Sequence, residues 1–133
     1  MNEKSSVTGH CECGAVRFTV TGKLRDVSIC HCGQCRRFGG NVGAYTSAAR
    51  RDVAFASDKG LRWYRSSAKA QRGFCGTCGS SLFWQGDGED RIAIAAGCLD
   101  APTGLKTAQH IFVAHRGDYY EITDNLPQAA EFP

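Results

Sequence analysis

Alternating apolar and polar residues along the chain predict a series of short β-strands. Val16, Phe18 and Val20 share one face, and the residues between them are polar, which is the pattern of a half-buried strand. Residues 81–85 and 91–95 flank an Asp-Gly turn and predict a hairpin. Further strands are predicted over residues 26–30, 53–55, 61–64, 110–114 and 119–122.

Helical periodicity is nowhere sustained for three turns, so we expect a mainly β fold. One helical turn is predicted over residues 34–38, where Gly39-Gly40 would end it. No repeat or linker divides the sequence, and residues 1–133 are expected to form a single domain. The core of short strands should be thin, with four aromatic side chains filling it: Trp63, Phe74, Phe83 and Trp84.

The composition excludes several classes of protein. With 42% hydrophobic and 22% charged residues in 133, the chain is not collagen-like, coiled-coil or disordered. No apolar run approaches the roughly 18 residues that a membrane span needs. The polar residues after Met1 do not resemble an export signal. We therefore expect a cytoplasmic protein without a membrane partner.

Cysteine is the unusual residue, with eight in the chain. Such closely spaced cysteines converge naturally on one metal ion but pair poorly as disulfides, so zinc is the favoured interpretation. Seven thiolates and two zinc ions would bring the formal net charge of +3 to zero, and the charges do not indicate a nucleic-acid surface. Seven cysteines lie in three clusters: Cys11 and Cys13; Cys30, Cys32 and Cys35; and Cys75 and Cys78.

Two partitions of these cysteines are compatible with the spacing. A structural zinc site needs four protein ligands, whereas a catalytic site keeps a position open. The simplest partition makes a closed site of Cys11, Cys13, Cys75 and Cys78, and an open site of Cys30, Cys32 and Cys35. A rival partition joins Cys32 and Cys35 with Cys75 and Cys78 as a zinc ribbon.

Six segments resemble those of a known family. They are Gly9–Phe18, Cys30–Arg37, Arg72–Phe83, Ala96–Asp100, His110-Ile111 and Leu126-Pro127. Together they are similar to the glutathione-dependent formaldehyde-activating enzymes, a family that also contains centromere protein V. The resemblance extends over residues 8–133.

The resemblance implies a zinc-stabilised β-tent of short coiled sheets that binds two zinc ions per chain. It implies a structural zinc held by Cys11, Cys13, Cys75 and Cys78. It also implies a catalytic zinc held by Cys30, Cys32 and Cys35. The implied reaction condenses glutathione with formaldehyde and is classed with the carbon–sulfur lyases, although the family alone does not identify the reactants.

The ligand chemistry is consistent with a thiol substrate. Three thiolates leave Zn²⁺ with a net charge of −1, which makes it a weaker Lewis acid than a zinc held by three histidines. A substrate thiol would be held as a thiolate, and a thiolate attacks an aldehyde readily. The alternative function is a non-catalytic zinc module that binds a protein or a nucleic acid.

Other residues have two or more interpretations. Cys98 is an inert buried thiol, a pocket-lining or reactive thiol, or a fourth ligand of the second zinc. His31 is expected to pack or to form hydrogen bonds rather than bind metal, and His110 lies either near the pocket or as an ordinary strand residue. The pair Arg36-Arg37 attracts a carboxylate-bearing substrate or forms a solvated turn, and Arg72 is expected to pair with a local carboxylate.

Overall fold

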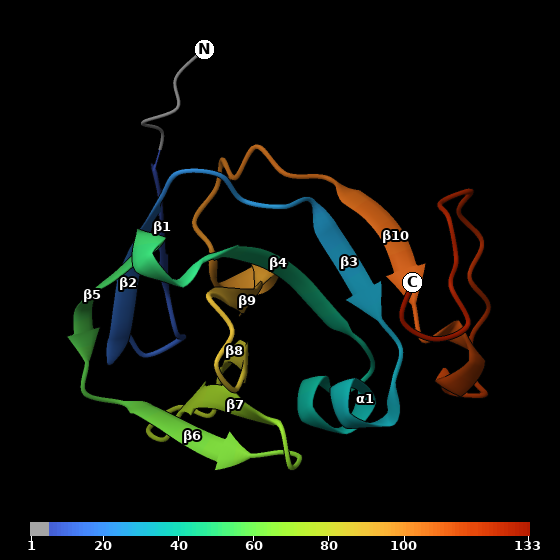
Figure 1. The fold of residues 1–133 in the computed structure, drawn as a ribbon, viewed down its shortest axis with the longest axis horizontal. Coiled ribbons are helices and arrows are strands. Elements are labelled where there is room, and N and C mark those ends of the chain that lie inside the picture. The colour runs from blue at the N-terminus through green and yellow to red at the C-terminus, as the bar shows by residue number, and fades with distance from the viewer. Residues whose placement is uncertain (1–5) are drawn as a thin grey trace.

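A computed structural model describes residues 6–133, and it shows two β-sheets packed around one core (Figure 1). The first sheet has three antiparallel strands in the order β1-β2-β5. Its strands are β1 (Ser6–His10), β2 (Val16–Thr21) and β5 (Val53–Asp58). The mainly β fold predicted from the sequence is confirmed.

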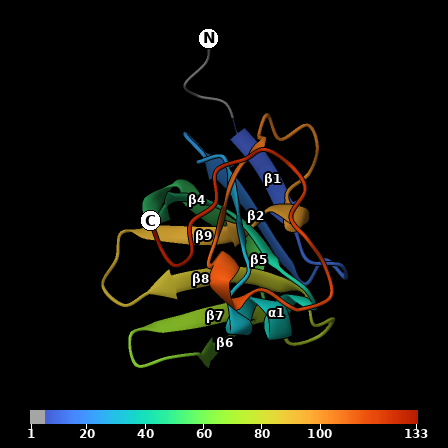
Figure 2. The ribbon, with the colours of Figure 1, turned by 90° about the vertical axis from the view of Figure 1, so that its right-hand side faces the viewer.

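The second sheet has seven strands in the order β10-β3-β4-β9-β8-β7-β6. Only the pair β10–β3 is parallel, and Figure 2 shows β9, β8, β7 and β6 stacked one below another. The strands are β3 (Val27–Cys30), β4 (Gly43–Ala49), β6 (Leu61–Arg65), β7 (Ala70–Cys75), β8 (Ser81–Gly86), β9 (Arg91–Ala95) and β10 (Thr107–Ile111).

Among residues 6–133, three short helices connect strands and a fourth follows the last strand, β10. Helix α1 (Gly33–Gly39) follows β3 and ends at Gly40, whose φ of 89° gives the left-handed conformation of a helix end. The others are single 3₁₀ turns: η1 (Arg50–Asp52), η2 (Ala96–Cys98) and η3 (Val113–His115). Within residues 6–133, no helix has the length and apolar character needed to cross a membrane.

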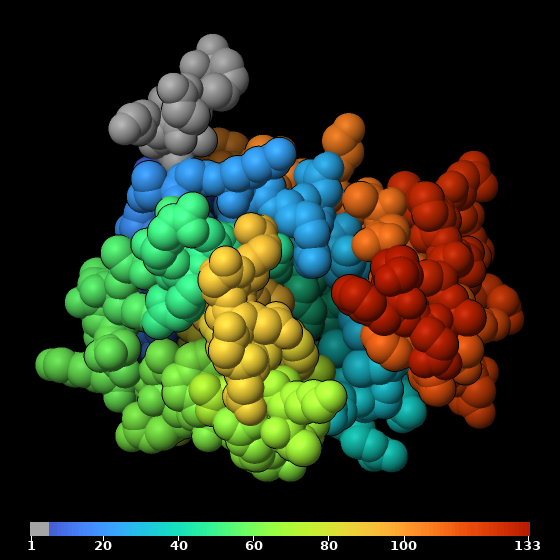
Figure 3. All heavy atoms as spheres, viewed as in Figure 1, coloured from blue at the N-terminus to red at the C-terminus, as the bar shows by residue number. Residues whose placement is uncertain are grey.

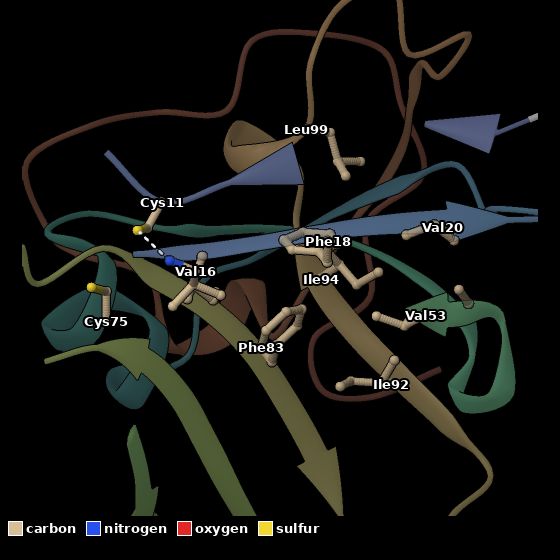
Figure 4. Packing of buried hydrophobic residues seen from close by; sticks show 12 residues of the cluster. Cys11, Val16, Phe18, Val20, Val53, Cys75, Phe83, Ile92, Ile94 and Leu99 are labelled. Atoms are coloured by element: carbon tan, nitrogen blue, oxygen red, sulfur yellow. Dashed lines mark hydrogen bonds between the residues drawn. The ribbon is translucent and has the colours of Figure 1, made fainter. Parts of the chain in front are cut away.

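The core lies between the two sheets (Figure 4). The face predicted for Val16, Phe18 and Val20 is buried there, and Phe18 meets Phe83 of β8 edge-to-face at 5.2 Å between ring centroids. Of the four aromatic residues expected to fill the core, only Phe83 is fully buried. Trp63 is 36% exposed, and Phe74 and Trp84 are half-buried and do not belong to the core cluster.

The sequence pattern located most strands but failed near the C-terminus. The predicted strand 110–114 is wrong beyond Ile111, because Phe112 has a φ of 56° and the chain turns into η3. The predicted strand 119–122 is absent, and Tyr119 and Tyr120 form hydrogen bonds through their hydroxyl groups, with Asn41 and His31. Strands β1, β4 and β7 were not predicted. Small residues such as Gly43, Ala44 and Ala48 make β4 pass through a crowded interior without an alternating pattern.

The C-terminal residues form an outer layer beside β3 and β10, drawn in red in Figure 3. Backbone hydrogen bonds join the two parts: His110 donates to Pro127, and Ala129 donates to His110, each at 2.9 Å. The segment is therefore attached to the strand that lies next to β3.

Candidate metal centres

The first cysteine cluster links the two sheets. Its four sulfur atoms lie within 4.8 Å of one another and belong to Cys11, Cys13, Cys75 and Cys78. The first two cysteines follow β1 of the three-stranded sheet, and the other two lie at the turn between β7 and β8. The close approach of four thiols from two sheets fits the four-sulfur donor set that zinc prefers.

Backbone amides point at the sulfur atoms of this cluster. The amides of Thr77 and Cys78 each donate to Cys75 Sγ at 3.4 Å, and that of Val16 donates to Cys11 Sγ at 3.3 Å (Figure 4). Hydrogen bonds of this kind stabilise a thiolate. The pKa of Cys75 is lowered, first by the Cys78 amide. The pKa of Cys78 is lowered to about 5, first by the Ser80 hydroxyl.

The second cluster comes from one short segment. The sulfur atoms of Cys30, Cys32 and Cys35 lie within 4.8 Å of one another. Cys30 is the last residue of β3, Cys32 is the N-cap of α1 and accepts a hydrogen bond from the Cys35 amide, and Cys35 is buried in the first turn. The strand end and the helix start thus bring three thiols together, and zinc accepts such a set.

The two clusters are separate in space. Among residues 6–133, the convergent groups hold four and three cysteines, and Cys32 and Cys35 do not join Cys75 and Cys78. The zinc-ribbon alternative is therefore wrong. Cys98 belongs to neither group, because its thiol donates to the Ala95 carbonyl oxygen at 3.0 Å. The interpretation of Cys98 as a fourth ligand is also not supported.

Arg72 of β7 is a cation in contact with the second cluster. It is 4% exposed, and its Nη2 donates to Cys35 Sγ at 3.6 Å. Within the described chain it forms no ion pair with a carboxylate, so the predicted carboxylate partner is wrong. The pKa of Cys35 is lowered to about 6, first by a hydrogen bond from the Cys30 thiol and then by the charge of Arg72.

A chain of hydrogen bonds leads from the second cluster to the C-terminal segment. The Asp124 carboxylate accepts from His110 Nε2 at 2.9 Å, and His110 Nδ1 lies 2.9 Å from His31 Nε2. His31 Nδ1 in turn meets the Tyr120 hydroxyl. A neutral imidazole has one donor and one acceptor nitrogen. With His110 Nε2 donating to Asp124, His110 Nδ1 accepts from His31 Nε2. His31 Nδ1 then accepts a hydrogen bond from the Tyr120 hydroxyl.

This arrangement agrees with the expectation that His31 forms hydrogen bonds, and burial lowers the pKa of His31. His110 is both a strand residue and a neighbour of the second cluster's loop, through His31. Tyr120 and Asp124 were missed. No spacing in the sequence connects them with His31, which is 89 residues from Tyr120.

Two hollows lie at the surface of the described chain, and none of the second cluster's cysteines lines either of them. One, of about 370 Å³, is lined by aromatic side chains of α1, β6 and β7, namely Phe38, Tyr64 and Phe74. The other, of about 400 Å³, adjoins the first cluster and includes Cys98 in its wall. Arg37 is exposed on α1, whereas Arg36 is half-buried, and its Nε is buried without a hydrogen-bond partner among residues 6–133.

The chain is similar to known proteins. Residues 6–115 match the family described as glutathione-dependent formaldehyde-activating enzyme. No curated protein matches the chain. A crystal structure of a Rhodobacter sphaeroides protein is similar, with 25% sequence identity and a TM-score of 0.61; the match covers 75% of this chain and 97% of that one.

Proposed function

Because the chain belongs to the glutathione-dependent formaldehyde-activating enzyme family, we propose that it is a zinc-dependent enzyme of the carbon–sulfur lyase type. Its substrates would be a glutathione-like thiol and a small aldehyde, or the adduct of the two. We propose two zinc ions per chain. The first, structural, is held by Cys11, Cys13, Cys75 and Cys78, and the second, catalytic, by Cys30, Cys32 and Cys35.

The observation that carries the proposal is the difference between the two donor sets. Four thiols satisfy the preferred coordination of zinc, whereas three leave one position for a substrate. Within residues 6–133, the second group contains no fourth cysteine, histidine or carboxylate. Zinc bound there would supply the charge that keeps a substrate thiol ionised at neutral pH.

The chain's own residues would orient the substrate. Arg37 is exposed on α1, and Arg36 Nε is a buried donor without a partner in the described chain. Because Arg36 Nε is closed to solvent, the exposed Arg37 guanidinium is the group that would pair with a carboxylate of a glutathione-like thiol. Holding thiol and aldehyde together near α1 would supply the advantage of proximity.

The experiment uses protein with Co²⁺ in place of Zn²⁺. Glutathione should strengthen the sulfur-to-cobalt charge-transfer absorption of wild-type protein, because a fourth sulfur joins three. Cys35→Ser should weaken this response, and Cys98→Ala should keep it, because Cys98 lies outside both groups. A parallel assay measures formation of S-(hydroxymethyl)glutathione by NMR with ¹³C-labelled formaldehyde.

Two results would contradict the proposal. One is an unchanged cobalt spectrum on adding thiol to wild-type and Cys98→Ala proteins, with cobalt confirmed in both sites. The other is an adduct-formation rate equal to the uncatalysed rate. Either result would favour the non-catalytic zinc module.

A further inference from the structure

Arg72 is a buried cation for which the proposed function does not yet account. Each of its three nitrogen atoms donates a hydrogen bond, and an aromatic ring covers one face of the guanidinium. Nε donates to Gln34 Oε1 at 3.2 Å, Nη1 to the Tyr45 hydroxyl at 3.4 Å and Nη2 to Cys35 Sγ at 3.6 Å. The Phe38 ring covers one face, with its centroid 5.4 Å from Cζ.

Of these partners, only Cys35 can carry a negative charge at neutral pH. Gln34 is a neutral amide, Tyr45 is a phenol and Phe38 is an aromatic hydrocarbon. No carboxylate of residues 6–133 forms an ion pair with Arg72. A charge that is 4% exposed is costly unless an opposite charge compensates it. The compensating charge must therefore come from the cysteine cluster.

We propose that Arg72 is the counter-ion of the second cysteine cluster and that it allows this cluster to accept an anionic sulfur ligand. The inference rests on the proposed function. Three thiolates and one divalent zinc ion sum to −1, and the Arg72 guanidinium brings the local charge to zero. A substrate thiolate then makes the local charge only −1. Without Arg72 the same step would create a charge of −2 in a partly buried site, which electrostatic repulsion disfavours.

The surroundings of Arg72 explain why an arginine serves here. A guanidinium offers donors in a fixed plane, so Gln34 and Tyr45 can hold two edges while Nη2 faces Cys35. Gln34 lies in the same helix as Cys35, and its side-chain Nε2 donates to the Ser66 carbonyl oxygen at 2.9 Å. Arg72 is therefore a positioning residue that acts on the metal site through Cys35.

The test compares three variants with wild type after cobalt loading. Arg72→Gln removes the charge, Arg72→Lys keeps it, and Arg51→Gln removes a charge from the exposed turn η1 as the matched control. Each protein is titrated with glutathione and followed by charge-transfer absorption, and its cobalt content and thermal melt are measured. These readouts do not depend on catalytic activity.

We expect Arg72→Gln to weaken the apparent affinity for the thiol by about 10- to 100-fold, the usual effect of losing a partner of a metal ligand. Arg72→Lys should keep most of the affinity, and Arg51→Gln should match wild type. Loss of the second cobalt equivalent from Arg72→Gln but not from Arg72→Lys would also support the inference. If Arg72→Gln does not fold, retention of the thiol response in Arg72→Lys supports it.

Two outcomes would overturn the counter-ion role alone. The first is a thiol affinity in Arg72→Gln within a factor of about two of wild type, well below the effect expected for a metal-ligand partner. The second is an equal loss of cobalt or of thiol response in folded Arg72→Gln and Arg72→Lys, since it would mean that shape rather than charge matters. No thiol response in wild type would overturn the proposed function and the inference together.

Discussion

Burial determines the chemical character of Cys98. Its thiol is partly buried against the core, donates to the Ala95 carbonyl and lies outside both convergent cysteine groups. Burial raises the pKa of Cys98 to about 12, so the thiol stays protonated at physiological pH. A protonated thiol is a poor nucleophile. Cys98 therefore lines the hollow of about 400 Å³, as one of the interpretations expected, but its protonated, hydrogen-bonded thiol is inert rather than reactive.

We expect iodoacetamide at pH 8 to modify Cys98 at least about a hundredfold more slowly in the native protein than in the denatured chain. The raised pKa makes the thiolate scarce in the folded state, and unfolding restores the ordinary value of 9.0. Peptide mapping by mass spectrometry measures both rates. Equal rates would show a reactive thiol, and loss of the second metal from Cys98→Ala would show a ligand.

At the scale of elements, the chain of Asp124, His110, His31 and Tyr120 fastens the C-terminal segment to β10 and β3. It also holds the imidazole ring of His31, the residue that separates two proposed zinc ligands, Cys30 and Cys32, in the sequence. Hydrogen bonds thus join side chains of β10, of the residue that follows β3 and of an irregular segment.

Asp124→Asn tests this connection through pH. Because His110 donates to the carboxylate, the pKa of Asp124 lies below its ordinary value of 3.8. Its contribution to stability is therefore present above pH 3.8 and is lost as the pH falls through the lower folded pKa. We expect the variant to melt a few degrees below wild type at pH 7, and this difference to close below about pH 3.8.

The matched control is Asp118→Asn, an exposed residue of the same segment. Its melting temperature should follow that of wild type at every pH. Two results would contradict the stabilising role. One is an equal melting temperature for Asp124→Asn and wild type at pH 7, and the other is a difference in melting temperature that stays as large at acid pH. Differential scanning calorimetry on all three proteins supplies the comparison.

The segment from β3 to α1 holds the second cluster without crossing the core. Cys32→Ser should therefore leave a cooperative melt, because the first cluster and the core do not depend on it, and should remove one equivalent of tightly bound metal. Metal analysis beside a thermal melt measures both effects. A variant that unfolds completely would mean that both metals are structural.

At the scale of the whole molecule, the first cluster joins the two sheets at the edge of the core. Cys11 and Cys75 are themselves buried members of the core cluster (Figure 4). A metal at that position would join a turn after β1 to the turn between β7 and β8. Structural zinc in a small domain contributes up to about 10 kcal/mol to folding.

Cys75→Ser should consequently yield largely unfolded protein, because it removes a central ligand and a buried side chain together. Circular dichroism and a thermal melt test this directly. A variant that melts within a few degrees of wild type would show that the first cluster is dispensable for folding.

The sequence by itself determined the mainly β class, the turn at α1 and the grouping of close cysteines. These features depend on neighbours in the chain: alternation sets the face of β2, and residues only two or three apart hold Cys30, Cys32 and Cys35 together. Strands such as β4 escaped prediction because small residues on both faces remove the alternation.

The tertiary structure alone decided which distant residues meet. Arg72 reaches Cys35 across 37 residues, and His31 reaches His110 across 79. These contacts depend on sheet order and strand register, and the parallel pairing of β10 with β3 places His110 opposite Ile29. A shift of one residue in a strand turns its side chains to the other face. Local spacing therefore predicted which neighbouring thiols converge, whereas register selected the charges and hydrogen bonds around them.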